Sequence, residues 1–99
     1  MNMQNLMAQA QKVQKDMQKK QAEINETIFD GKSECVSVKM NGKREVQALE
    51  IKKDILNDEE DLEMLEDMII IAFNDALSKI EKETKQKMGM YGDGLSGLM

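Results

Sequence analysis

Lysine side chains supply most of the chemistry that this chain offers. Lys12, Lys15 and Lys19 recur at steps of three and four residues, so in a helix they share one face. A row of ammonium groups at this spacing can bind successive phosphates of a nucleic-acid backbone as point charges that read no bases. The same row is also typical of an ordinary solvated helix face, which is the more common meaning of such a pattern.

A second group of lysines lies near the end of a second predicted helix. It consists of Lys79, Lys82, Lys85 and Lys87, with Glu81 and Glu83 between them. These lysines could also contact phosphate groups. Cations near a helix C-terminus complement the helix dipole, so this group has a structural explanation as well.

Other reactive side chains are scarce. The chain has no His, no Trp and one cysteine, Cys35, which removes the common zinc sites and most pairs of nucleophile and base. Residues 58–67 hold seven acids, but they lack the glycine and spacing of a calcium-binding loop, and acids are favoured at a helix start. We therefore expect no enzyme, no metal, no cofactor and no small-molecule substrate.

The composition indicates a single small domain that gains from a partner subunit. A chain of 99 residues buries a limited core, and this one has ten Met but only three aromatic residues. The net charge of -5 argues mildly against a polyanionic partner. However, charge is segregated along the chain, since residues 1–22 contain four lysines and one acid.

The sequence predicts a cytoplasmic protein with no membrane segment. A lone cysteine cannot form an internal disulfide, and the start of the chain lacks the apolar stretch of a secretory signal. No stretch approaches the roughly 20 consecutive apolar residues that a membrane-spanning helix needs.

Two helices are predicted from apolar periodicity. The first runs from Met3 to Glu26, contains no Gly or Pro, and carries an apolar seam at heptad spacing. The second begins with Asn57 and Glu60 as a capping box and ends at Gly89, with its polar end beyond Ile80 projecting into solvent. The seam of the first helix comprises Met3, Leu6, Ala10, Val13, Met17 and Ile24. The domain is thus expected to span residues 1–89, and residues 90–99 form a glycine-rich flexible tail.

Three antiparallel strands are predicted between the helices. Alternation ending at Met40, followed by Asn41 and Gly42, indicates a hairpin with a type I′ turn that leads into residues 45–51. The apolar parity shifts within the second strand of this hairpin, which predicts a bulge. A further strand is expected at residues 28–30, so the predicted fold class is α+β, in the order α-β-β-β-α.

Several short segments resemble the YbaB/EbfC family of bacterial nucleoid-associated proteins. They are Asn5-Leu6-Met7-Ala8-Gln9-Ala10-Gln11-Lys12, Val36-Ser37-Val38-Lys39-Met40-Asn41-Gly42, Asp61-Leu62-Glu63-Met64-Leu65-Glu66-Asp67 and Ala72-Phe73-Asn74-Asp75-Ala76. Each segment alone is weak evidence, but their order and spacing are specific, and the likeness runs from about Asn5 to Met90.

This resemblance implies a tweezer-like homodimer with projecting helices that binds duplex DNA, organises the nucleoid and in some members regulates genes. Carried over by position, the implied DNA-binding residues are Lys12, Lys15, Lys19, Lys20, Lys79, Lys82, Lys85 and Lys87. Lysine lacks the bidentate fork that reads guanine, so we expect low sequence specificity. The alternative is a protein-interaction adaptor of the replication or recombination machinery that uses the acidic start of the second helix.

Overall fold

The structure is a computed structural model that describes residues 2–52 and 59–89. Its elements are α1 (Met3–Glu26), β1 (Ile28–Lys32), β2 (Val36–Asn41), β3 (Val46–Ile51) and α2 (Glu59–Met88). This order confirms the predicted α+β fold of helix, three antiparallel strands and helix. The expected cap at Asn57 and the expected tail at residues 90–99 lie outside the described residues. None of the described helices is both long and apolar enough to cross a membrane.

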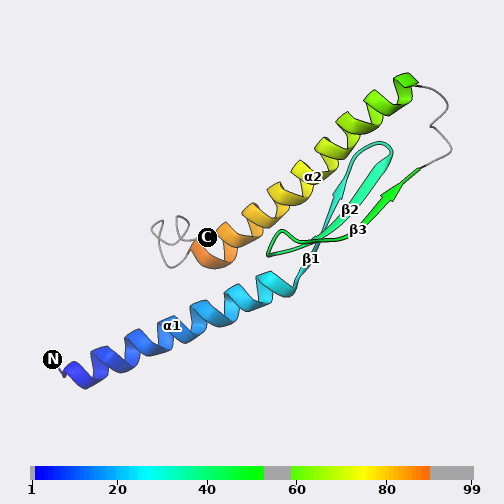
Figure 1. The fold of residues 1–99 in the computed structure, drawn as a ribbon. Coiled ribbons are helices and arrows are strands. Elements are labelled where there is room, and N and C mark those ends of the chain that lie inside the picture. The colour runs from blue at the N-terminus through cyan, green and yellow to red at the C-terminus, as the bar shows by residue number, and fades with distance from the viewer. Residues whose placement is uncertain (1, 53–58, 90–99) are drawn as a thin grey trace.

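The molecule measures 72 × 20 × 15 Å, and helix α1 extends away from the rest of it (Figure 1). The Asn2 side chain caps its start by accepting a hydrogen bond from the Gln4 amide at 3.0 Å. At the other end Thr27 turns into extended backbone while its amide still donates to the carbonyls of Glu23 and Ile24. The helix therefore begins and ends at the residues that its sequence predicts, and only its last turns reach the body.

The three strands form one antiparallel sheet in the order β1-β2-β3. Lys39 pairs with Ala48 and Met40 pairs with Val46, so Gln47 is an extra residue in β3. This confirms the predicted bulge. The hairpin is confirmed too, but the predicted type I′ turn is wrong, because the positive φ angle is at Arg44 (φ 67) and not at Asn41. The Arg44 amide donates to the Asn41 carbonyl, which makes a three-residue loop closed by a left-handed residue.

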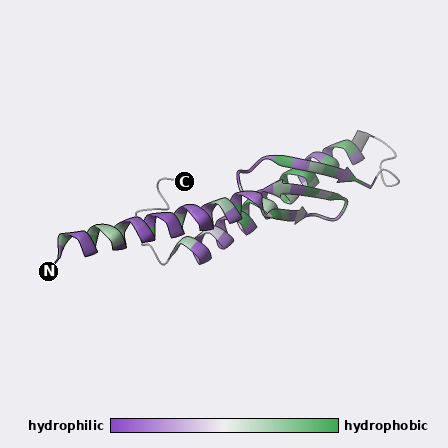
Figure 2. Ribbon diagram, turned by 90° about the horizontal axis from the view of Figure 1, so that it is seen from below, coloured by the Kyte–Doolittle hydropathy of each residue, from purple (hydrophilic) through white to green (hydrophobic). Residues whose placement is uncertain are grey.

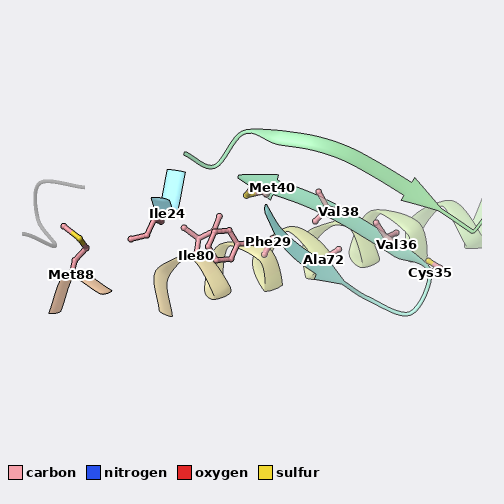
Figure 3. Packing of buried hydrophobic residues seen from close by; sticks show 10 residues of the cluster. Ile24, Phe29, Cys35, Val36, Val38, Met40, Ala72, Ile80 and Met88 are labelled. Carbon is pink, nitrogen blue, oxygen red and sulfur yellow. The ribbon is translucent and has the colours of Figure 1, made fainter. Parts of the chain in front are cut away.

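The core lies between α2 and one face of the sheet (Figure 3). Val38 of β2 and Ile80 of α2 are fully buried, and Ile24 brings the end of α1 into the same cluster. Gly31 allows β1 to approach α2 closely, because a Cβ atom there would lie 2.0 Å from the Ala72 carbonyl oxygen. Cys35 is buried in this core as well.

The end of α2 differs from the prediction of a segment that projects into solvent. Met88 is only 6% exposed, and Thr84 is half-buried. The reason is tertiary, because the last turns of α1 pack beside this part of α2 (Figure 1). The polar end of α2 therefore packs beside α1, and the part of α1 before these last turns extends beyond the body (Figure 1).

The apolar seam of α1 is also less buried than a packed helix requires. Met3, Leu6 and Val13 are 75%, 49% and 48% exposed, whereas Met17 and Ile24 contact the core. Figure 2 shows apolar residues gathered in the sheet and in α2, while α1 is mostly hydrophilic. Most of α1 is thus available as surface.

Candidate nucleic-acid interface

A row of three lysines lies along the projecting part of α1. Lys12, Lys15 and Lys19 are exposed, and none forms an ion pair with a residue that the structure describes. At 1.5 Å per residue, the row is about 10 Å long, which matches about three base pairs of duplex at 3.4 Å each. We call these three residues the α1 lysine row. It lies almost opposite Met17 and Ile24, the residues by which α1 packs on the core.

Lys20 lies apart from the α1 lysine row. Its ammonium group is 3.5 Å from the Asp16 carboxylate, and its side chain is 26% exposed. Asp16 is the single acid in residues 1–22 and lies beside Lys12, Lys15 and Lys19 on this side of α1. It also pairs with Lys20, so it offsets the charge of the α1 lysine row only in part.

Lys79 connects α2 to the edge of the sheet. Its Nζ atom donates to the Asp30 carbonyl of β1 at 2.6 Å and lies 3.3 Å from the Asp75 carboxylate. Asp75 in turn accepts a hydrogen bond from the Lys32 amide at 3.0 Å. Two exposed backbone groups of an edge strand are thereby bonded, so this lysine holds the fold together.

These contacts lower the pKa of Asp75 below its ordinary value of 3.8, chiefly through the Lys32 amide and then through the Lys79 ammonium, against the effect of desolvation. A depressed pKa stabilises the folded state above pH 3.8, and this contribution is lost as pH falls through the folded pKa. We expect Asp75→Asn to lower the melting temperature at pH 7 by a few degrees, and the difference from wild type to shrink below pH 3.8.

Melting curves followed by circular dichroism between pH 2.5 and pH 7 measure this effect. Asp67→Asn on the same helix is the matched control. This change removes the same charge, but Asp67 is exposed and makes no hydrogen bond to β1. A difference for Asp75→Asn that is as large at pH 2.5 as at pH 7 would show that the carboxylate charge has no part in it.

The remaining α2 lysines lie among acids on their own helix. Lys85 pairs with Glu81 at 3.3 Å, and Lys87 pairs with Glu83 at 3.5 Å. Lys82 is exposed and has no ion pair with a described residue. Four lysines and three acids, counting Asp75, leave this end of α2 with a net charge of +1, against +3 for residues 1–22.

Comparison with known proteins shows the family. The model of the YbaB/EbfC DNA-binding family matches residues 1–95. This chain belongs to that family. A nucleoid-associated protein of Lactococcus lactis subsp. lactis is 53% identical over 97 residues, which is 96% of this chain and 97% of the relative. A nucleoid-associated protein of Enterococcus faecalis is 46% identical over 98 residues, which is 97% of this chain and 93% of the relative.

Membership confirms the resemblance seen in the sequence, and the YbaB/EbfC family is one of DNA-binding proteins rather than of enzymes. The structure of this YbaB/EbfC protein also shows two exposed basic residues that the sequence analysis did not select as candidates. Lys43 and Arg44 are exposed in the turn between β2 and β3. Their adjacency directly after Asn41-Gly42 was a signal available in the sequence, since a hairpin turn is a surface feature.

Proposed function

We propose that this protein binds duplex DNA as a homodimer in the bacterial nucleoid, within the cytoplasm, and contributes to nucleoid organisation. The α1 lysine row supplies the main contacts. The observation that carries this proposal is the position of Lys12, Lys15 and Lys19, which are exposed and without described ion pairs on the part of α1 that extends from the body. Three ammonium groups on such an arm can approach a phosphate backbone without bringing the acidic body against it.

The contacts proposed here carry little sequence information. Lysine binds phosphate as a compact point charge, whereas reading of guanine favours the planar fork of arginine. The α1 lysine row contains no arginine. Binding is therefore expected to depend strongly on salt and weakly on base sequence.

The other lysines have secondary roles in this proposal. Lys82 is the α2 lysine best suited to contact phosphate, since it has no ion pair with a described residue. Lys20, Lys79, Lys85 and Lys87 contribute positive field from ion-paired positions. Paired surface charges must exchange their carboxylate partner for a phosphate, so their net gain on binding is small.

The acids at the start of α2 favour one orientation of the protein on DNA. Asp61, Glu63, Glu66 and Asp67 lie in the first part of α2, which points away from the projecting end of α1 (Figure 1). A duplex is repelled from that end of the molecule and attracted to the other.

The proposed dimer interface is an apolar surface on one side of the body. Helix α2 packs mainly on β1 and β2, so the apolar face of β3 extends past the helix. Val46 and Leu49 share the face of the buried β2 residues with which they pair, yet they are 45% and 47% exposed. A sheet face that is apolar but uncovered is favourable to bury against a second molecule.

Helix α2 continues this surface. Asp75 and Lys79 mark the flank of α2 that faces β1, so helical periodicity places Ile70 and Phe73 on the opposite flank, toward β3. Ile70 is 57% exposed. The occupant we propose is a second copy of this chain, because a two-fold axis would set the half-exposed β3 of each copy against the exposed α2 flank of the other.

Fluorescence anisotropy with labelled duplexes of unrelated sequence tests the proposed function. The three phosphate contacts of the α1 lysine row alone contribute about -2.7, for each engaged protomer, to the slope of log affinity against log salt. The affinity should thus fall at least about 40-fold between 50 and 200 mM salt with one protomer engaged, and at least about 10³-fold with two. If the protein binds no duplex at 50 mM salt, the DNA-binding proposal is wrong and the adaptor interpretation replaces it.

A further inference from the structure

We propose that the turn between β2 and β3 is a second DNA-contact site, in which Lys43 and Arg44 bind backbone phosphates next to those bound by the α1 lysine row. This inference rests on the proposed function and deepens it. It concerns a loop of the sheet, whereas the contacts described above come from helices.

The turn packs directly against the end of α1. A Cβ atom on Gly42 would lie 2.0 Å from the Ile24 carbonyl oxygen, so the turn backbone touches the last turns of the helix. Lys43 lines a shallow hollow together with Ala22 and Glu26 of α1. The turn that carries Lys43 and Arg44 therefore lies next to the point where α1 joins the body.

This contact places the turn in line with the α1 lysine row. Lys15, Lys19, Ala22 and Glu26 follow each other at steps of four, three and four, so they share one face of the helix. Because Lys43 lies beside Ala22 and Glu26, it continues the face that carries Lys15 and Lys19. From Lys15 to Glu26 the helix rises by about 16 Å, which is about five base pairs of duplex.

The backbone of Arg44 gives an independent argument for function. Its φ of 67° is left-handed, a conformation that is unfavourable in residues other than glycine and is better tolerated by Asn or Asp. Its side chain forms no hydrogen bond or ion pair with any residue that the structure describes. Arg44 is also the one arginine of the chain. Fold stability thus gives no reason for arginine here, whereas phosphate binding does.

The turn is rigid enough to present these groups. The Asn41 side-chain oxygen accepts hydrogen bonds from the amides of Lys43 and Glu45, both at 3.0 Å. The Asn41 side-chain nitrogen donates to the Glu45 carboxylate at 2.9 Å, so this neighbouring acid is bonded to the turn itself. A fixed loop loses little conformational entropy on binding, and the planar guanidinium can bind phosphate through two parallel hydrogen bonds.

The test compares the salt dependence of duplex binding between two double variants. Lys43→Gln with Arg44→Asn removes both charges and puts a residue at position 44 that accepts a left-handed backbone. Lys32→Gln with Lys52→Gln is the matched control, since both lysines are exposed, unpaired with described side chains, and at the opposite end of the sheet. Melting temperatures establish that each variant is folded.

We expect the turn variant to bind at least about tenfold more weakly at 100 mM salt, with a salt slope shallower by about 2 for each engaged protomer. The control should keep the wild-type slope and lose less than about twofold in affinity. Arg44→Lys should bind more tightly than Arg44→Asn and more weakly than wild type, because it keeps the charge and loses the fork.

Failure of this inference and failure of the proposed function give different results. If wild type binds and the turn variant behaves like the control, the turn makes no contact with DNA. The proposed DNA contact of α1 would still stand in that case. If wild type binds no duplex at 50 mM salt, both the proposed function and the turn contact are wrong.

Discussion

Replacing Lys12, Lys15 and Lys19 together with Gln is expected to weaken duplex binding by at least about 10²-fold at 100 mM salt. At this salt each lost phosphate contact costs about eightfold in affinity through counterion release. The salt slope should also become shallower by about 3 for each engaged protomer. Gln has nearly the helix propensity of Lys, and the three positions are exposed, so the helix should stay folded.

The matched control for the α1 lysine row is the triple change of Lys82, Lys85 and Lys87 to Gln. It removes the same charge from another helix, but two of its lysines are already paired with Glu81 and Glu83. We expect this variant to lose at most about tenfold in affinity, the effect of one phosphate contact at Lys82. Equal losses in the two triple variants would mean that total charge, rather than the α1 lysine row, determines binding.

Leu49→Glu is expected to convert the dimer to monomers, raising the dimer dissociation constant at least about 10³-fold. In a two-fold dimer the change occurs twice, so two apolar contacts are lost. Two carboxylates would also have to be desolvated in the interface, and this cost favours dissociation. DNA affinity should fall as well, because a monomer engages one arm where the dimer engages two. Sedimentation velocity at micromolar concentration measures the oligomeric state.

Ala48→Glu is the matched control for this change. Ala48 pairs with Lys39, so it lies on the face of β3 opposite to Leu49, and it receives the same carboxylate. This variant should remain a dimer. Circular dichroism shows whether each variant is folded, and wild-type protein that sediments as a folded monomer would contradict the interface without any substitution.

Local sequence signals were sufficient for most of the fold. Helix α1 has the predicted bounds because its cap, its propensities and its apolar spacing all agree from Met3 to Glu26. The bulge at Gln47 followed from a shift in apolar parity. The turn type was wrong because Asn41-Gly42 is a strong type I′ signal, whereas here Asn41 uses its side chain to bond the turn and Arg44 takes the left-handed position.

The candidate site, like the fold, could be predicted only where local sequence determines the structure. Lys12, Lys15 and Lys19 could be predicted as one exposed face because only helix periodicity is needed. The role of Lys79 could not be predicted, because its partner carbonyl at Asp30 lies 49 residues away along the chain. Lys79 reaches this carbonyl only when α2 packs along the edge of β1. The burial of Met88 likewise depends on the packing of α1 beside α2, which no local pattern encodes.

Helix α1 is proposed to contact DNA through the face that carries Lys12, Lys15 and Lys19. Titration of ¹⁵N-labelled protein with a short duplex, followed by two-dimensional NMR, locates the contact residue by residue. We expect chemical-shift changes concentrated at residues 8–22 and at the β2–β3 turn, with little change at residues 61–67. Shifts centred on the acidic start of α2, with α1 unperturbed, would contradict this proposal.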